Sequence, residues 1–203
     1  MESAAIESPE FWENRYQEGT ARWDLGQPAP PFVSLLASAN GPKPGSLIAL
    51  GMGRGHDALL FAEYGFAVTG VDFAPSAIAG AQQLAQVKGV PLATLQCNMF
   101  DLATEYAGKF DYVLEHTCFC AIAPTQRSAY VELVHALLKP SGEFIGLFWA
   151  HSREGGLPYG TTKAEICDLF SPYFDLTSLE LVANSIPNRA NEEYLARFRK
   201  LIG

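Results

Sequence analysis

The sequence contains no long hydrophobic run and no cluster of basic residues. None of its apolar stretches approaches the roughly 18 residues that a membrane-spanning helix requires, so we expect no membrane segment. The formal net charge is −8, from 14 Lys and Arg against 22 Asp and Glu. Because phosphate contacts need clustered Lys and Arg, this composition disfavours a nucleic-acid partner.

Cysteine is scarce as well, and the beginning of the sequence lacks the features of a secretion signal. Residues 1–10 are acidic and do not show a charged segment followed by an apolar one. The four cysteines, Cys97, Cys118, Cys120 and Cys167, lie in or near expected core elements, which predicts buried free thiols in a reducing compartment. Cys118 and Cys120 have no second pair, so we expect no metal site. Together these features predict a cytoplasmic protein.

The sequence does contain enough apolar material for one core. Its 203 residues are 48% hydrophobic, and they include no internal repeat, low-complexity tract or linker. A chain of this length can bury one sizeable core and is marginal for two domains. We therefore expect residues 1–203 to form a single domain.

The most informative stretch is residues 47–57, LIALGMGRGHD, where an apolar run ends in alternating glycines. Residues 58–64 are apolar at helical spacing, and residues 66–72, FAVTGVD, form a second apolar run that ends in Asp72. This order predicts a strand, a glycine turn, a helix and a strand. Glycine lets a ligand approach the backbone, and an acid at this place can accept hydrogen bonds from a ribose diol. The stretch therefore predicts a nucleoside-binding βαβ unit.

The glycine spacing indicates which kind of nucleoside is bound. Dinucleotide sites prefer G-x-G-x-x-G, with the last glycine inside the helix. Here Gly51, Gly53 and Gly55 form G-x-G-x-G, and His56 takes the place of that last glycine. The pattern resembles the first motif of S-adenosylmethionine-dependent methyltransferases, whose donor has no pyrophosphate. An ordinary strand–helix turn and a nicotinamide-dependent oxidoreductase remain alternatives.

Strands and helices alternate along the chain. Helices are expected at residues 9–18, 32–40, 58–64, 75–88, 124–138 and 162–170, and strands at residues 47–50, 66–72, 93–97, 109–115, 143–149, 174–182 and 193–200. We predict a Rossmann-like α/β fold, with a seven-stranded, mostly parallel sheet, helices on both faces and an antiparallel last strand. Ligands of such sheets bind beyond the carboxyl ends of the strands. This rule gathers a set of polar and glycine residues into one crevice: Gly51, Asp72, Asn98, Met99, Glu115 and His116.

Eight short motifs are distributed over nearly the whole chain. They are FWENRY (11–16), WDLGQP (23–28), GMGRGHD (51–57), GVD (70–72), FCAIAP (119–124), LKPSG (138–142), GGLPY (155–159) and SIPNR (185–189). Together they resemble the thiopurine S-methyltransferase superfamily, in particular its plant-type halide and thiol methyltransferase branch. The resemblance implies a class I methyltransferase fold with S-adenosylmethionine as the co-substrate.

The resemblance also implies which residues contact the methyl donor. Residues 1–40 would form a helical lid, and its aromatic residues Trp12, Tyr16 and Trp23 would close over the donor. The family more often has tryptophan where Tyr16 stands, and often an acid where Asn98 stands. The other implied donor contacts are Gly51 and Gly53 in the glycine loop, Asp72 at the ribose, Phe73 after it, Asn98 and Met99 at the adenine, and Glu115 and His116.

The acceptor side rests on three residues that match the family's motifs. His116 would lie beside the reactive end of the donor, where it would hold an incoming anion or take a thiol proton; a polar residue at a strand end is the alternative. Tyr159 would line the acceptor cavity, and Arg189 would attract an anion, with surface solvation as the alternative for Arg189. Glu115 would bind the donor's ammonium group or cap a structural turn.

The chemistry favours a soft nucleophile. The methyl group of a sulfonium is already activated, and aromatic faces stabilise the positive sulfur by about 0.5–2 kcal/mol each. A small thiol, with a pKa of about 8.5, is partly ionised near neutrality and needs little help from a base. We therefore predict methyl transfer to a thiol, hydrosulfide or halide by a monomer or weak dimer. Metalloid oxyanions, oxygen or nitrogen acceptors and a non-catalytic S-adenosylmethionine-binding protein remain alternatives.

Overall fold

The computed structural model describes residue 6 and residues 8–202 of the chain. Seven strands form one sheet in the order β3-β2-β1-β4-β5-β7-β6. The pairings of β1 with β2, β2 with β3 and β4 with β5 are parallel, whereas β7 is antiparallel to both β5 and β6. This confirms the predicted mostly parallel seven-stranded sheet with an antiparallel last strand. The chain divides into two compact units, residues 1–99 and 100–203, which are described separately.

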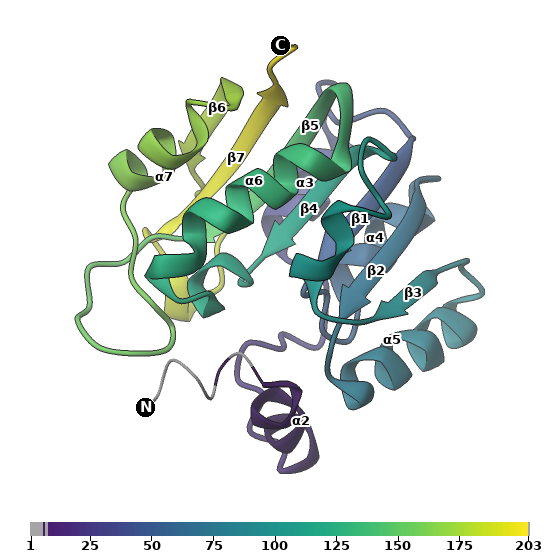
Figure 1. The fold of residues 1–203 in the computed structure, drawn as a ribbon. Helices are drawn as coiled ribbons and strands as arrows, with labels where there is room; N and C mark the ends of the chain where they lie inside the picture. The colour runs from purple at the N-terminus through teal and green to yellow at the C-terminus, as the bar shows by residue number, and fades with distance from the viewer. Residues whose placement is uncertain (1–5, 7, 203) are drawn as a thin grey trace. The chain divides into compact units, whose positions relative to one another are not determined.

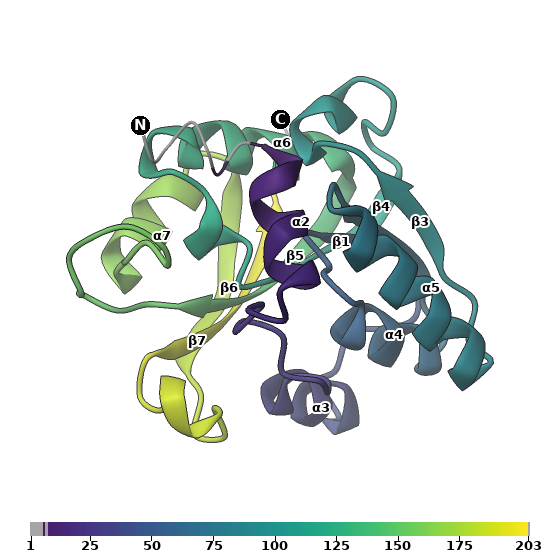
Figure 2. The same cartoon turned by 90° about the horizontal axis from the view of Figure 1, so that it is seen from below.

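The described residues of the first unit include helices α2 and α3, followed by a βαβαβ run (Figure 1). Its elements are α2 (Pro9–Gln17), α3 (Pro30–Ala37), β1 (Ser46–Leu50), α4 (His56–Glu63), β2 (Ala67–Asp72), α5 (Pro75–Lys88) and β3 (Ala93–Gln96). Figures 1 and 2 show α3, α4 and α5 next to one another on one face of these strands. Helices α2, α3 and α5 each have proline in the first turn, where a missing N–H leaves no helical hydrogen bond unmade. The apolar run of β1 is buried, as a central parallel strand requires.

Gly70 in β2 lies directly against the side chain of Met52. A Cβ atom added at Gly70 would be 1.9 Å from the Met52 sulfur and 2.9 Å from its Cε, so no side chain fits there unless Met52 moves. Because Met52 stands between Gly51 and Gly53, such a movement would displace the glycine loop. Gly70 in the GVD motif therefore leaves the space that Met52 and the preceding glycine loop need.

We expect Gly70→Ala to lower the free energy of unfolding by about 2 kcal/mol, because overpacking a filled core typically costs about 1–3 kcal/mol. Urea denaturation measures the change. The double variant Met52→Ala/Gly70→Ala removes the atoms that clash and should recover more than half of the loss. Strict additivity of the two single effects would contradict this explanation, since contacting residues that clash must couple.

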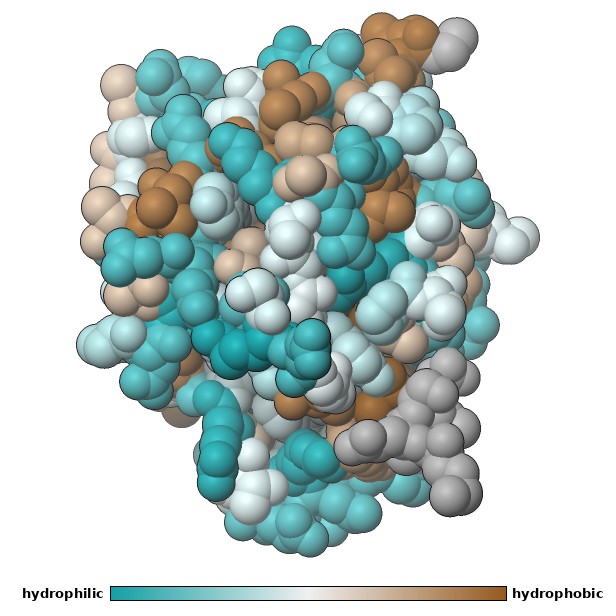
Figure 3. Space-filling view, turned by 90° about the vertical axis from the view of Figure 1, so that its left-hand side faces the viewer, coloured by the Kyte–Doolittle hydropathy of each residue, from teal (hydrophilic) through white to brown (hydrophobic). Residues whose placement is uncertain are grey.

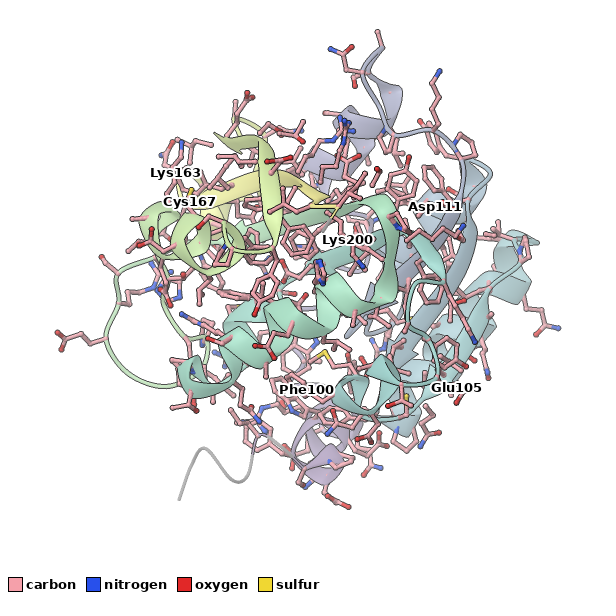
Figure 4. All side chains as sticks on the ribbon, turned by 45° about the horizontal axis from the view of Figure 1, so that its top comes forward. Phe100, Glu105, Asp111, Lys163, Cys167 and Lys200 are labelled. Atoms are coloured by element: carbon pink, nitrogen blue, oxygen red, sulfur yellow. The ribbon has the colours of Figure 1, made fainter. Side chains whose placement is uncertain are left out.

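The second unit, as described up to residue 202, contains four strands and two α-helices. Its elements are η1 (Met99–Ala103), which overlaps the boundary, β4 (Phe110–His116), η2 (Phe119–Ala121), η3 (Pro124–Gln126), α6 (Arg127–Leu137), β5 (Leu138–Trp149), α7 (Lys163–Phe170), β6 (Phe174–Leu181), η4 (Pro187–Arg189) and β7 (Glu193–Lys200). Its core is a cluster of phenylalanines, in which the Phe170 and Phe198 rings stack with centroids 4.7 Å apart. Lys200 donates hydrogen bonds to the carbonyls of His135 and Leu138, which ties the end of β7 to the junction of α6 and β5 (Figure 4).

Most predicted elements are confirmed within one or two residues, and the main differences have local causes. The segment 139–142, predicted as a turn, lies within β5; Pro140 lacks an N–H and Ser141 has a positive φ of 62°, so the pairing with β4 is irregular there. The helix predicted at 124–138 begins as the 3₁₀ turn η3 before α6. The helix predicted at 32–40 runs from Pro30 to Ala37, because two prolines occupy its first turn and Ser38 is extended. A 3₁₀ turn, η1, occupies most of the loop predicted at 98–102.

The surface of the described residues carries scattered apolar side chains. The large exposed ones are Val33, Tyr64, Val87, Leu176, Leu181 and Ile202. Figure 3 shows hydrophobic residues as separate patches among hydrophilic ones on the face that it displays. Isolated apolar residues of this kind are common on protein surfaces and indicate no docking face. Among the helices of the described residues, none is long and apolar enough to cross a bilayer.

Candidate active site

The loop between β1 and α4 is built from glycines in the left-handed conformation. The φ angles of Gly51, Gly53 and Gly55 are 58°, 57° and 77°. Residues with a Cβ atom rarely adopt this conformation, which explains the alternation of glycines in the sequence. The Met52 N–H donates to the Val71 carbonyl at 2.9 Å and so joins the loop to the end of β2. The first unit thus exposes loop backbone at Gly51 and part of Gly53 before α4, whereas Gly55 is buried against Ala81.

Asp72 at the end of β2 shapes this loop. Its Oδ2 accepts a hydrogen bond from the Gly53 N–H at 2.9 Å, and its Oδ1 accepts one from the Ala74 N–H at 2.9 Å. The side chain is 9% exposed, and burial raises its pKa, while the backbone N–H groups of Ala74, Gly53 and Phe73 lower it. A carboxylate oxygen has two lone pairs, so both oxygens can still accept a hydrogen bond from a ribose diol. The geometry therefore fits the predicted ribose contact.

We expect Asp72→Asn to weaken binding of S-adenosylhomocysteine about 10- to 100-fold, measured by isothermal titration. The amide nitrogen cannot accept the N–H of Gly53 or Ala74, and an unsatisfied buried donor costs about 1–3 kcal/mol. A 2′-deoxyribose analogue of the ligand separates loop distortion from ribose binding. The wild type should discriminate against the analogue and the variant should not; equal discrimination by both proteins would contradict a ribose contact. Asp111→Asn, at a half-exposed carboxylate that pairs with Lys139, is the control.

The predicted donor-covering aromatics form one cluster with the glycine loop. The Trp23 ring meets those of Trp12 and Tyr16 edge to face, with centroids 5.2 and 5.6 Å apart, and the Trp23 Nε1–H donates to the Tyr16 hydroxyl at 3.2 Å. A Cβ atom at Gly53 would be only 3.0 Å from that hydroxyl. Burial and the nearby Asp72 charge raise the pKa of Tyr16, so its hydroxyl keeps its proton. Trp12 and Trp23 therefore belong to the same cluster as Tyr16, whose hydroxyl lies next to the glycine loop.

Three carboxylates hold the N-terminal segment in this position. Glu13 accepts hydrogen bonds from the Ser76 N–H at 2.9 Å and the Ser76 hydroxyl at 2.6 Å, at the start of α5. Asp24 pairs with Arg54 of the loop at 3.0 Å and with His56 at 3.3 Å. The Asp57 carboxylate accepts the Ala29 N–H at 2.7 Å. Within the first unit these contacts fit the predicted lid at residues 1–40, of which residues 1–5 and 7 lie outside the described residues.

The remaining residues predicted at the donor lie where the strand-end rule expects them. Asn98 follows β3, and Met99 begins η1. The Cys97 N–H donates to the Asp72 carbonyl at 3.3 Å, which joins this segment to the end of β2. The contact of Asn98 and Met99 with adenine stays a prediction.

In the second unit, Glu115 is a fully buried carboxyl at the end of β4. Its Oε1 accepts the N–H groups of Cys118 and Phe119, each at 2.9 Å, and its Oε2 has no hydrogen-bond partner among the described residues. Burial raises its pKa to about 7, although the Phe119 N–H and the His116 charge oppose the shift. Oε1 thus caps the turn after β4, as the structural alternative predicts. Binding of the donor's ammonium group stays a prediction.

His116 and Arg189 meet, although 72 residues separate them in the sequence. The Arg189 Nη1 is 3.1 Å from the His116 Nε2 and 3.1 Å from the Glu193 Oε1. Only 4% of the Arg189 surface is exposed, so the alternative of a solvated surface arginine is wrong. The short turn η4 and the start of β7 place this side chain in the interior. The structure therefore joins two of the three predicted acceptor residues.

Three residues of this cluster were not predicted. Glu193 is buried, and burial favours its protonation, but its interactions with His116, Ser185 and Arg189 outweigh that effect and lower its pKa. Ser185 donates to Glu193 at 2.8 Å, and the Trp149 ring lies 4.8 Å from the Arg189 guanidinium carbon. The i, i+4 spacing of Arg189 and Glu193 was a usable signal in the sequence. Nothing local indicated Trp149, which ends β5.

The Arg189 guanidinium retains hydrogen-bonding capacity. Arginine has five N–H donors and no acceptor. Among the described residues, Arg189 makes its hydrogen bonds through Nη1, to His116 and Glu193, which leaves the N–H groups of Nε and Nη2. Buried N–H groups of a cation are suited to hold a small anion that has lost its water.

Tyr159 is fixed by its backbone. Its N–H donates to the Cys120 carbonyl at 2.7 Å, and the buried Arg127 donates to the carbonyls of Tyr159 and Gly160 at 3.5 and 3.1 Å. Arg127 also pairs with Glu165 at 2.6 Å. Arg127 was not predicted, and its role is to hold the loop before α7. The lining role of the Tyr159 side chain stays a prediction.

A glycine loop after β1, an acid at the end of β2 and a seven-stranded sheet with an antiparallel β7 define a class I S-adenosylmethionine-dependent methyltransferase. The thiopurine S-methyltransferase family matches residues 7–200, and the chain belongs to this family. It is an enzyme, and S-adenosylmethionine is its co-substrate.

Relatives with described activities span nearly the whole chain. Thiocyanate methyltransferase 1 of Arabidopsis thaliana is 31% identical over 195 residues, which cover 94% of this chain and 84% of that protein. Thiocyanate methyltransferase 1 of Brassica oleracea is 30% identical over 194 residues, with the same coverage. The structure of Burkholderia thailandensis 1,6-didemethyltoxoflavin-N1-methyltransferase with bound S-adenosylhomocysteine shares the fold, with a TM-score of 0.78 at 24% identity, over 99% of this chain and 90% of that one.

Proposed function

We propose that the protein transfers the methyl group of S-adenosylmethionine to a small soft nucleophile, namely a thiol, hydrosulfide or halide. The observation that carries this proposal is the buried Arg189, whose remaining N–H groups suit a small desolvated anion. The similarity to thiocyanate and thiol methyltransferases supports it. We also propose that the protein acts in the cytoplasm as a monomer or weak dimer, without a nucleic-acid partner; the net charge of −8 supports the last point.

One set of residues binds the co-substrate, and another set binds the nucleophile. The co-substrate supplies an activated methyl group on a positively charged sulfur. Trp12, Tyr16 and Trp23 cover it and exclude water, and Asp72 orients its ribose. Arg189 and His116 hold the nucleophile, so that the encounter becomes intramolecular, which contributes up to about 7–11 kcal/mol of barrier reduction. The nucleophile then uses its own electron pair, and a halide needs no base.

Binding and turnover test the proposal separately. Isothermal titration with S-adenosylhomocysteine should show binding, and its absence at millimolar ligand would reject the donor site. Formation of S-adenosylhomocysteine is then measured with hydrosulfide, alkyl and aryl thiols, iodide, thiopurines and tellurite as acceptors. We expect turnover with thiols, hydrosulfide or iodide. Turnover confined to oxygen, nitrogen or metalloid acceptors would reject the soft-nucleophile proposal, and binding without any turnover would favour a non-catalytic role.

A further inference from the structure

His151 is a buried imidazole that the reaction described so far does not use. It follows β5, at the beginning of the loop that carries the GGLPY motif, and only 5% of its surface is exposed. Its Nδ1 and Nε2 are both buried, and neither makes a hydrogen bond of ordinary geometry with the described residues, although the Pro158 backbone is near enough to raise the pKa of the imidazole. Leaving a buried donor and a buried acceptor unsatisfied is costly, so such a side chain is expected to meet a ligand or water.

The neighbours of His151 connect it to the proposed acceptor site. The His151 and Trp149 rings meet edge to face, with centroids 5.0 Å apart. The same Trp149 ring lies 4.8 Å from the Arg189 guanidinium carbon, and its Nε1–H donates to Glu192 at 2.8 Å. Trp149 is therefore in contact with both the imidazole and the arginine, and its hydrogen bond to Glu192 holds the ring in place.

His116 is less suited to take a proton than the sequence suggested. The Arg189 Nη1 can only donate, so the His116 Nε2, 3.1 Å away, accepts this hydrogen bond. A neutral imidazole therefore has no lone pair left at Nε2, and an imidazole protonated beside the Glu115 and Glu193 carboxylates has none at all. A second proton at Nε2 would also face the guanidinium cation. A base for protic nucleophiles must therefore come from another residue.

We propose that His151 is a catalytic residue of the acceptor site that takes the S–H proton of a neutral thiol or hydrosulfide. This rests on the proposed function. The S–H bond breaks as its proton moves to a ring nitrogen of His151, and the sulfur electron pair forms the new bond to the methyl carbon. The bond between that carbon and the sulfonium sulfur breaks, which leaves a neutral thioether, and the imidazolium later releases its proton to water.

Burial and the surrounding charges keep the His151 imidazole neutral and able to accept a proton. Burial is the largest effect and lowers its pKa below the ordinary 6.5; Arg153 and Arg127 act in the same direction, and Glu192 and the Pro158 backbone oppose them. Gly160 faces the ring as well, since a Cβ atom there would be 3.4 Å from Nδ1 and 2.5 Å from the His151 carbonyl. The ring is thus enclosed by the loop whose other end Arg127 holds.

The test compares nucleophiles that carry a proton with those that do not. In the full-length protein, His151→Gln should lower kcat/KM for an alkyl thiol about 100-fold near neutral pH, the size expected for loss of a general base. The kcat/KM for iodide, and for an aryl thiol that is already ionised, should change less than about 3-fold. The variant's thiol profile should follow the ionisation of the thiol itself, whereas the wild-type profile should extend to lower pH.

His135→Gln is the matched control. His135 lies on α6, where its ring packs against Tyr173 and Phe174, and its pKa is lowered by burial as well. It should behave like the wild type with every acceptor. Equal losses for iodide and alkyl thiol in His151→Gln, or an unchanged thiol profile, would overturn the proposal.

If His151→Gln does not fold, a measurement on the wild type tests the proposal instead. The alkyl-thiol profile of kcat/KM should show an ionisation below pH 6.5 that the iodide profile lacks, and identical profiles would overturn the role of His151. If the wild type methylates neither thiols nor iodide, the proposed function itself fails, and this proposal fails with it.

Discussion

The double variant Arg189→Gln/Glu193→Gln is expected to lower kcat/KM for iodide about 1,000-fold, while the Kd for S-adenosylhomocysteine changes little. Removing one preorganised donor from a charge-stabilising site typically costs 100- to 1,000-fold, on the order of 3–4 kcal/mol. Arg189 would lose both its charge and its fork of donors, so we expect the upper end of this range. Steady-state kinetics with iodide and titration with S-adenosylhomocysteine measure the two quantities.

Both residues are changed because the single variant would leave an unpaired charge. Arg189 and Glu193 form a buried ion pair with a distance of 3.1 Å. Breaking a buried pair by removing one partner costs about 3–5 kcal/mol, whereas a neutral pair of similar shape keeps the hydrogen bond. Thermal unfolding of the double variant should therefore lie closer to the wild type than that of Arg189→Gln.

Two control variants test whether the loss of activity comes from Arg189. Glu193→Gln removes a negative charge beside the proposed anion site and should lower the KM for iodide. Arg153→Gln removes another guanidinium that lies over the Trp149 ring, at 5.1 Å, but this arginine is half-exposed and pairs with Glu192. It should leave kcat/KM nearly unchanged. A large loss in Arg153→Gln, or none in the double variant, would mean that Arg189 does not hold the nucleophile.

The second large effect is a change in the pH dependence of stability in Glu115→Gln. Burial raises the pKa of Glu115 from 4.5 to about 7 in the folded protein. Its protonated form is therefore favoured by folding, and the stability that this contributes is complete below about pH 4.5 and is lost as the pH rises through 7. At higher pH the wild type bears the cost of an ionised buried carboxylate, on the order of 3 kcal/mol.

The glutamine variant should not show this loss. Its amide oxygen can accept the N–H groups of Cys118 and Phe119, and its amide nitrogen replaces Oε2, which has no partner among the described residues. Urea denaturation at a series of pH values gives the unfolding free energy of both proteins. The difference, variant minus wild type, should increase by about 3 kcal/mol between pH 4.5 and a pH above 7. Parallel curves would show that Glu115 titrates normally in the folded protein.

The same residue connects stability with donor binding. If Glu115 binds the ammonium group of the donor, binding must stabilise its ionised form. Binding of S-adenosylhomocysteine near pH 6.5 would then release a proton, which titration in buffers of different ionisation enthalpy detects. No proton release would limit Glu115 to its structural role at the turn after β4.

The local signals in the sequence predicted most of the fold. Apolar runs separated by glycine turns identified the strands, and proline at the start and glycine at the end identified α5. The prediction failed where two local signals disagreed with the pairing of strands. Pro140 and Ser141 indicate a turn, but the apolar residues on both sides extend β5 through it. Family membership then decided between S-adenosylmethionine and a nicotinamide dinucleotide, which the glycine spacing alone left open.

The sequence by itself predicted the glycine loop and the acid of the proposed donor site, because Gly51, Gly53 and Asp72 act through backbone conformation and a strand end, which are local properties. It could not show that Arg189 is buried, that it pairs with Glu193 or that it occupies the lone pair of His116, because these depend on where β7 is inserted beside β5. Only the tertiary structure decided that His151, which carried no local signal, is buried beside Trp149, with no ordinary hydrogen bond from its ring to the part of the chain that the structure describes. Burial and pairing between distant segments set the chemistry of such side chains, and the spacing of residues in the sequence indicates neither.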